Sequence, residues 1–335
     1  MKSSDVCNRG TMVCMTATPS PHRPRLRFAG GVAAVVALML AGAAPARAFD
    51  PAILQSVVSV LPEWPDSARL PEAPEGTAVA VLEGGYLATN VHVLGRAKRL
   101  RIRLDDGRVL PAEIVGIDPP TDIALIKAPL DLPVPETAPA PALGAPVCAI
   151  GNQFGLGLSV TCGVVSALNR TGAGFNPIED FIQTDATVNP GGSGGALIDG
   201  TGRLVGLVSA IFTKKSDADI GVNFAASMAL VMRVVEDLRA HGRVIRGRLG
   251  LAVADLDLDE RRSGAGARVM RVAPDSGAAA AGLAPGDIVV AVAGRPIRKA
   301  SDVTAAVQLH RIGDSFAVTY LRGGARREVT VTLGR

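Results

Sequence analysis

A serine set among glycines is the strongest chemical signal in this 335-residue sequence. Ser193 stands within residues 189–195, which have the sequence NPGGSGG. Glycine lets a backbone turn sharply, so neighbouring N–H groups can point toward an oxyanion while the hydroxyl stays accessible. A flexible Gly/Ser loop or a phosphate cradle has the same composition. The serine therefore indicates nucleophilic chemistry only if a base and an acid accompany it.

Histidine is scarce, which makes the search for that base short. Three of the four histidines follow position 48, at His92, His241 and His310. His241 and His310 end predicted helices, where an imidazole favours the helix dipole, so we expect both at the surface. His92 follows a strand-like segment in the same region as Ser193, and Asp122 opens the apolar run IALIK, where an unpartnered acid is disfavoured. The order His92, Asp122, Ser193 therefore predicts the triad of a serine hydrolase.

Short strands must position these side chains. Residues 77–224 consist of alternating or wholly apolar runs separated by glycine turns, a pattern typical of an all-β barrel or sandwich. Ser227 then predicts the start of a helix over 228–241. The remaining residues, about ninety, contain short strands, a helix capped by Ser301 and a hairpin over 316–333. The chemistry thus lies in a β-rich region that a helix separates from a small carboxy-terminal module.

Several spaced motifs of this region share a family resemblance. TNVHV, TDIALIK, AIGNQFGLG, VTCGVVSAL and IQTDATVNPGGSGGAL, together with the glycine-bearing end module, resemble the HtrA/DegP family of exported serine proteases. The resemblance implies a mainly β chain, with a trypsin-like double β-barrel protease domain followed by one α+β PDZ domain. The expected divisions are a signal peptide over 1–48, an amino-terminal arm over 49–76, the protease domain over 77–242 and the PDZ domain over 243–335.

The resemblance also implies roles for individual residues. Ser193 would attack the peptide carbonyl, His92 would transfer the proton and Asp122 would orient the imidazolium. The N–H groups of Gly191 and Ser193 would form the oxyanion hole. Asp185 of QTDA is expected to organise a loop rather than to serve as a second acid. A specificity pocket for small aliphatic side chains is expected from apolar residues that follow the serine, namely Leu207, Val208, Ile211 and Ile220.

Three departures from the family pattern bear on activity. Gly192 precedes the serine where the family commonly has Asn or Asp, so we expect a looser loop and an oxyanion hole that is incompletely formed at rest. GTAVAV replaces a Gly-Ser-Gly start, and AAS at 225–227 replaces Ile-Pro-Ser. The triad residues are all present, so these differences bear on basal activity and subsite preference.

A second candidate site lies at the start of the end module. RGRLGL resembles the PDZ carboxylate-binding loop and precedes a stretch very like the PDZ core. We expect Leu249, Gly250 and Leu251 to bind a terminal carboxylate through backbone N–H groups, while the bound peptide adds as a strand. The expected partners are C-terminal peptides and unfolded or misfolded protein substrates. The family further implies a homotrimer, with the arm after Phe49 as its contact.

The two cysteines that follow position 48 allow two interpretations. Cys148 and Cys162 lie symmetrically about Gly155 in a predicted hairpin. A cross-strand disulfide suits an exported chain, and two buried free thiols are the alternative. No His/Cys/acid cluster has the spacing of metal ligands, so neither a metal nor a cofactor is expected.

The first 48 residues carry the excess positive charge of the chain. Six basic residues and one acidic residue lie there, which leaves about −1 on the remainder of a chain with formal net charge +4 and argues against a nucleic-acid-binding protein. Three arginines precede an apolar run over 28–44 and an Ala-Arg-Ala site at 46–48, the layout of a secretory signal peptide. Met1, Met12 and Met15 are candidate starts. We expect a periplasmic protein without a stable membrane span if the leader is cleaved, and a membrane-anchored protein facing the periplasm if it is not.

Two other functions compete with proteolysis. Gly-x-Ser-x-Gly is also the nucleophile elbow of α/β-hydrolase esterases, but that fold needs its histidine after the serine, whereas His92 precedes Ser193. A weakly or non-proteolytic PDZ-containing chaperone or binding protein is the stronger alternative, although the complete triad favours catalysis. The sequence predicts an exported, ATP-independent serine endopeptidase that degrades unfolded or damaged envelope proteins.

Overall fold

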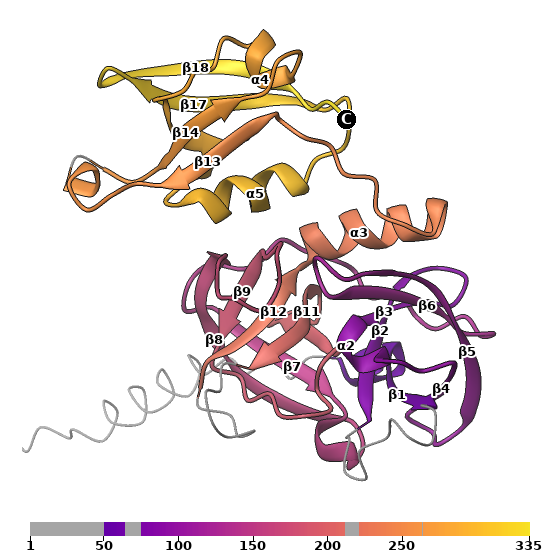
Figure 1. Ribbon diagram of the computed structural model, residues 1–335. Coiled ribbons are helices and arrows are strands. Elements are labelled where there is room, and N and C mark those ends of the chain that lie inside the picture. The colour runs from indigo at the N-terminus through magenta and orange to yellow at the C-terminus, as the bar shows by residue number, and fades with distance from the viewer. Residues whose placement is uncertain (1–49, 64–74, 212–220, 263) are drawn as a thin grey trace, which may run out of the picture. The chain divides into compact units, whose positions relative to one another are not determined.

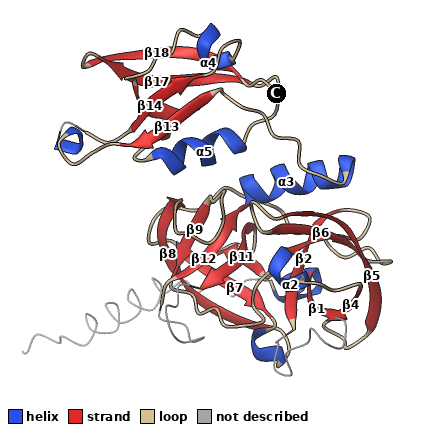
Figure 2. Ribbon diagram, in the orientation of Figure 1, coloured by secondary structure: helices blue, strands red, loops and turns tan. Residues whose placement is uncertain are grey.

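The computed structural model describes residues 50–63, 75–211, 221–262 and 264–335. The predicted signal peptide over 1–48 and the expected pocket residue Ile220 lie outside this part of the chain. Strands predominate within it and form two closed barrels followed by a separate sheet (Figures 1 and 2). None of the helices in the described ranges is both long and apolar enough to cross a bilayer.

Six antiparallel strands close the first barrel in the order β1-β2-β3-β6-β5-β4. They are β1 (Val57–Glu63), β2 (Gly76–Leu82), β3 (Tyr86–Asn90), β4 (Arg99–Arg103), β5 (Val109–Asp118) and β6 (Ile123–Lys127). Successive side chains of a strand point in opposite directions. The strand β6 is apolar on both faces because each face packs into a core. Ala124 and Ile126 join a core made by the first barrel, whereas Ile123 and Leu125 join a second core that other elements share.

The second barrel repeats this architecture with the strand order β10-β11-β12-β9-β8-β7. Its strands are β7 (Pro146–Gly151), β8 (Ser159–Arg170), β9 (Phe181–Thr184), β10 (Ala196–Asp199), β11 (Leu204–Ile211) and β12 (Asn223–Ser227). Val79 of the first barrel belongs to the same core cluster as Phe181 and Phe224 of the second. The boundary between the barrels is therefore apolar, and burying it holds the two barrels together.

The helix α3 (Met228–His241) follows the second barrel and adds Val231 and Leu238 to the shared core. Ser227 Oγ accepts the Leu230 N–H at 3.3 Å, and Gly242 ends the helix in the left-handed conformation at φ +68°. The predicted helix is thus confirmed at both ends. Three shorter helices of the double-barrel region are η1 (Pro51–Ser56), α2 (Val91–Leu94) and η2 (Gln153–Gly155).

The carboxy-terminal residues form a sheet around a core of their own, with strand order β13-β14-β15-β17-β18 and β16 paired to β15. Its elements are β13 (Leu251–Asp255), η3 (Glu260–Arg262), β14 (Ala267–Val272), α4 (Gly277–Ala280), β15 (Ile288–Val292), β16 (Arg295–Pro296), α5 (Ala300–Gln308), β17 (Ser315–Arg322) and β18 (Ala325–Thr332). The prediction of Ser301 as a helix cap was wrong. The helix α5 begins at Ala300, because the Asp302 carboxylate accepts the backbone N–H of Lys299 at 3.2 Å and so supports an earlier start. Two barrels followed by this PDZ-like sheet confirm the predicted fold class.

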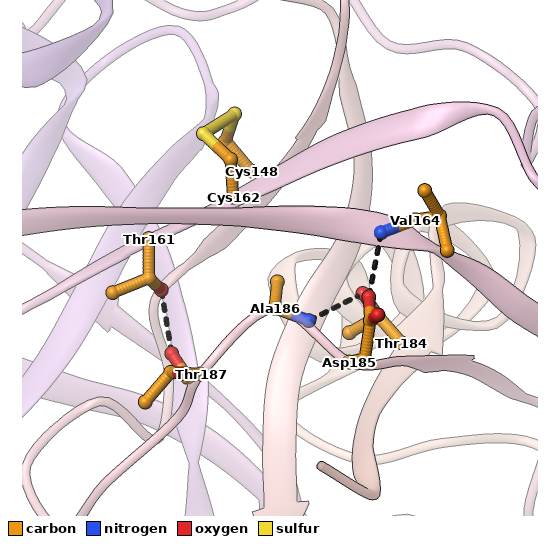
Figure 3. The surroundings of a disulfide bond; sticks show 8 residues. All are labelled: Cys148, Thr161, Cys162, Val164, Thr184, Asp185, Ala186 and Thr187. Atoms are coloured by element: carbon orange, nitrogen blue, oxygen red, sulfur yellow. Dashed lines mark hydrogen bonds between the residues drawn. A yellow bond between two sulfur atoms is a disulfide. The ribbon is translucent and has the colours of Figure 1, made fainter. Parts of the chain in front are cut away.

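The structure resolves the question of the two cysteines in favour of a disulfide. Cys148 on β7 and Cys162 on β8 are directly opposite in the strand register, and their sulfur atoms are bonded at 2.08 Å (Figure 3). Cys162 is exposed and Cys148 is partly buried, so the alternative of two buried thiols was wrong.

Candidate active site

His92 and Asp122 form a directly bonded pair in the first barrel. His92 lies in α2, just after β3, and Asp122 ends the turn between β5 and β6. Asp122 Oδ2 lies 2.5 Å from His92 Nδ1, and Asp122 Oδ1 accepts the His92 backbone N–H at 3.0 Å. The His92 side chain is 50% exposed and that of Asp122 is 15% exposed. The carboxylate therefore fixes a ring that solvent can reach, while the acid itself is sheltered.

The backbone of Asp122 is held from outside its own turn. Its φ is +59°, in the left-handed region that non-glycine residues rarely adopt. The Val91 N–H and the Asn90 side-chain amide both donate to the Asp122 carbonyl at 3.0 Å. Asn90 is buried and also donates to Ser209 Oγ at 3.3 Å. Asn90 was not among the predicted site residues, although its amide at the end of an apolar strand, two residues before a histidine, was a usable signal.

Ser193 lies in the loop between β9 and β10 of the second barrel, and this loop is bonded to both barrels. The Thr77 N–H in β2 donates to the Ser193 carbonyl at 2.9 Å. The Gly194 N–H donates to the Val208 carbonyl in β11 at 2.8 Å. The loop therefore bridges the boundary between the barrels. The first barrel also crosses this boundary at Asn90, two residues before His92, through its bond to Ser209 in β11.

Two glycines of this loop are required by the space around them. Gly191 has φ +94°, and a Cβ there would lie 2.3 Å from the Asn152 carbonyl oxygen. Gly194 has φ +83°, and a Cβ there would lie 2.0 Å from the Thr77 carbonyl oxygen. Gly192 differs, because its nearest contact would be the Asn189 carbonyl oxygen at 3.1 Å and its φ is not positive. The space around Gly192 is therefore tight for a side chain but does not exclude one as firmly as the space around Gly191 and Gly194.

The backbone donors of Gly191 and Ser193 are available to a ligand. Within the described part of the chain, the N–H groups of Gly191 and Ser193 donate to no protein acceptor. The N–H groups on either side of Ser193 are engaged, since Gly192 N–H donates to Asn189 O at 2.9 Å and Gly194 N–H donates to Val208 O at 2.8 Å. Free N–H groups beside a serine hydroxyl are suited to hold an oxyanion.

Thr77, which was not among the predicted site residues, anchors the loop. Its hydroxyl donates to the Gly191 carbonyl at 2.6 Å and accepts the Asn152 N–H at 2.9 Å. Asn152 is held in turn by its side chain, which donates to Glu75 at 2.8 Å. The signal in the sequence was a hydroxyl in the otherwise apolar run GTAVAV, and its partner lies 114 residues away.

The segment that leads into the serine loop is bonded to β8 on either side of the disulfide (Figure 3). Asp185 Oδ1 accepts the Val164 N–H at 2.7 Å, and Thr161 Oγ1 donates to the Thr187 carbonyl at 2.5 Å. Asp185 therefore organises the backbone of this segment, as predicted.

The residues expected to form the specificity pocket fall into two groups. Leu207 and Val208 lie on β11 and are almost completely buried, and the backbone of Val208 is bonded to the serine loop. Ile211 is the last residue of β11, and Ile220 lies outside the described residues. The described ranges contain no group of three or more His, Cys, Asp or Glu side chains able to hold a metal ion.

The candidate peptide site lies at the start of the PDZ-like sheet. Leu249 is buried, and its carbonyl accepts the Ala278 N–H at 3.1 Å. Gly250 has φ +79°, and its carbonyl accepts the Ala273 N–H at 2.7 Å. Leu251 begins β13, the first strand in the order of the sheet. The Leu249–Leu251 backbone thus turns directly into a strand at the edge of the sheet.

Two family models match the chain, the trypsin-like peptidase domain over residues 76–207 and the PDZ domain over residues 247–333. The periplasmic serine endoprotease DegP of Salmonella typhimurium is 39% identical over 261 residues, which cover 74% of this chain and 54% of the relative. The periplasmic pH-dependent serine endoprotease DegQ of Escherichia coli is 34% identical over 281 residues, with 81% and 62% covered. The chain thus spans about half the length of the curated relatives it matches.

Solved structures show the same similarity. The HtrA-type protease AlgW with a tripeptide is 37% identical with a TM-score of 0.65, and the match covers 84% of this chain and 94% of that one. A serine endoprotease from Yersinia pestis is 32% identical with a TM-score of 0.55, and the match covers 86% and 99% of the two chains.

Proposed function

Because this chain belongs to the HtrA/DegP family of serine proteases, we propose that it is a serine endopeptidase with Ser193 as its nucleophile. The pair formed by Asp122 and His92 carries the proposal. A carboxylate that holds Nδ1 leaves Nε2 as the basic nitrogen of the ring, which is the arrangement that activates a serine hydroxyl. The endoprotease names of the relatives support the same reaction.

The reaction follows from the roles of these groups. Ser193 Oγ attacks the carbonyl carbon of the peptide bond while its proton passes to His92 Nε2. The carbonyl oxygen becomes an oxyanion that accepts hydrogen bonds from the N–H groups of Gly191 and Ser193, each worth roughly 3 kcal/mol in the transition state. The C–N bond then breaks, and the leaving amine takes the proton from Nε2. Water repeats the sequence to release the acyl chain from Ser193.

The PDZ domain is proposed to bind exposed C-termini at Leu249, Gly250 and Leu251. On its outer side β13 pairs with no other strand of the described sheet, so an extended peptide can add there while loop N–H groups hold its carboxylate. The solved structure of AlgW with a tripeptide shows that a relative binds peptides.

The proposed substrates are unfolded or damaged proteins of the bacterial envelope. The relatives are named as periplasmic, which supports a periplasmic location with residues 1–48 as the signal peptide. The family supports a homotrimer. Residues 57–63 of the expected arm over 49–76 form β1 inside the first barrel, so that part of the arm prediction was wrong and the contact is proposed for the arm residues outside this strand.

Casein cleavage by the chain from Phe49 onward tests the proposal, with Ser193→Ala as control and a hydrophobic C-terminal peptide added to both. Cleavage by the wild type alone supports the assignment of Ser193, and stimulation by the peptide supports a PDZ-controlled oxyanion hole. A folded wild type that never cleaves but suppresses aggregation would instead indicate a chaperone or binding protein.

A further inference from the structure

The loop formed by residues 172–179, termed here the Glu179 loop, is organised around one buried carboxylate. Four consecutive backbone N–H groups donate to Glu179, from Ala173 at 2.6 Å, Gly174 at 3.0 Å, Phe175 at 2.8 Å and Asn176 at 3.0 Å. Glu179 itself is only 3% exposed. A side chain that satisfies four successive donors determines the path of the whole loop.

The charge of Glu179 is stabilised by these N–H groups and by no cation. Within the described residues, the carboxylate forms no ion pair with Lys, Arg or His. Burying an unpaired carboxylate is unfavourable, and the N–H donors offset that cost only while the loop keeps its conformation. The charge and the loop conformation therefore depend on each other.

The Glu179 loop of the second barrel is bonded to the turn that carries Asp122 in the first. The Ile178 N–H donates to the Pro120 carbonyl at 3.0 Å, and the Asn176 side chain donates to the Thr121 carbonyl at 3.4 Å. Pro120 and Thr121 are the two residues directly before Asp122. The loop therefore holds the backbone from which the Asp122 carboxylate extends toward His92.

We propose that Glu179 is a positioning residue for the endopeptidase reaction, acting through its loop on Asp122. The inference rests on the proposed function. Asp122 has a left-handed backbone, which persists only where surrounding contacts determine it. The Val91 and Asn90 donors hold the carbonyl of Asp122, and the Glu179 loop holds the two carbonyls before it. Together these contacts fix the carboxylate that orients His92.

Two substitutions test the inference directly. Glu179→Gln keeps the shape of the side chain but replaces an acceptor oxygen with an NH₂ group facing an N–H donor. Because a misplacement of about 1 Å in a catalytic group can cost about 100-fold, we expect kcat to fall about 10-fold in Glu179→Gln, with KM within about twofold. Asn176→Ala keeps its backbone N–H bond to Glu179 and loses only the bond to Thr121, so we expect kcat to fall about threefold.

Asp199→Asn is the matched structural control. Asp199 is also a buried carboxylate that caps a turn of the second barrel, accepting the N–H groups of Thr201 at 2.9 Å and Arg203 at 3.1 Å. Its turn lies between β10 and β11 and, among the described residues, forms no hydrogen bond with the His92–Asp122 pair. We expect Asp199→Asn to lower the urea midpoint of unfolding while kcat stays within about twofold of wild type.

A double-mutant cycle separates positioning from general destabilisation. Labelling of Ser193 by a fluorophosphonate probe is measured for Glu179→Gln alone and in an Asp122→Ala background. If Glu179 acts through Asp122, Glu179→Gln slows the labelling of Ser193 roughly 10-fold in the wild-type background and less than about twofold in the Asp122→Ala background.

The outcomes are distinct. A wild-type protein that neither cleaves casein nor labels at Ser193 overturns the proposed function and the inference together. An active wild type with an unchanged kcat in folded Glu179→Gln, or with additive losses in the cycle, overturns the positioning role alone. If Glu179→Gln does not fold, Asn176→Ala decides, and a wild-type kcat in that variant overturns the inference.

Discussion

Replacing Thr77 by valine removes one hydroxyl from the boundary between the barrels and leaves the side-chain shape nearly unchanged. Thr77 is fully buried, at 0% exposure, and its hydroxyl bonds to the Gly191 carbonyl at 2.6 Å and the Asn152 N–H at 2.9 Å. A net hydrogen bond contributes about 1 kcal/mol, and a buried partner left unpaired costs about 1–3 kcal/mol. We therefore expect the free energy of unfolding to fall by about 2–4 kcal/mol in Thr77→Val.

The same substitution should affect catalysis through Gly191. The Thr77 hydroxyl holds the carbonyl of the residue whose N–H is one of the two proposed oxyanion donors. Complete loss of one such donor lowers kcat by about 100- to 1,000-fold. Because Thr77→Val loosens the donor without removing it, we expect kcat/KM on a chromogenic peptide to fall about 10- to 100-fold.

Ser227→Ala provides the comparison. It also removes two hydrogen bonds, from the Leu230 N–H at 3.3 Å and to the Asp180 carboxylate at 2.5 Å, but it lies at the start of α3. We expect its free energy of unfolding, measured in urea, to fall by about 1–2 kcal/mol with little change in kcat/KM. Equal losses of kcat/KM in the two variants, or none in Thr77→Val, would refute the anchoring role of Thr77.

Three further predictions concern other parts of the molecule. Gly191→Ala should abolish measurable casein cleavage, because its Cβ would lie 2.3 Å from a backbone oxygen at φ +94°, whereas Gly192→Ala, with a nearest contact of 3.1 Å, should retain it. Replacing both Cys148 and Cys162 by serine should lower the free energy of unfolding in urea by about 3 kcal/mol, since the bond closes a sequence separation of 14; equal stability would contradict this. Burial lowers the pKa of His310 from its ordinary value of 6.5, so the unfolded chain binds the proton more readily and stability should decrease as pH falls from 7.5 through 6.5 toward the folded pKa. Urea unfolding at pH 7.5 and 5.5 should therefore show a smaller pH difference in His310→Gln than in wild type.

The residues that carry reactive groups were predictable because their signals are local. Ser193 is marked by its glycines, Asp122 by its place at the head of an apolar strand, and His92 by the scarcity of histidine. Strand periodicity predicted only an all-β barrel or sandwich. The family resemblance predicted the double barrel. Chemistry that depends on residue type and short spacing is therefore accessible from the sequence.

The residues that hold those groups in place were not predictable in the same way. Thr77 acts on Gly191, 114 residues away, and Asn90 bonds Ser209, 119 residues away. Glu179 bonds to residues near it in the sequence, but its proposed effect on the active site depends on contacts between its loop and the first barrel. The cysteine pair was predicted only as an alternative, because its bond depends on the register of two strands. Tertiary pairing determines each of these contacts, so a local signal can mark a residue such as Asn90 or Thr77 but cannot identify its partner.

The division of the proposed triad between two barrels couples activity to complete folding. The first barrel contains His92 and Asp122, and the loop with the proposed nucleophile Ser193 comes from the second. If the chain is exported with its amino end first, as the proposed location implies, it would form the base and acid before the serine loop can dock. Proteolysis would begin only after both barrels have joined, so a nascent or partly unfolded copy could not cut its neighbours. Activity in this protein would then serve as a sensitive report of its own structural integrity.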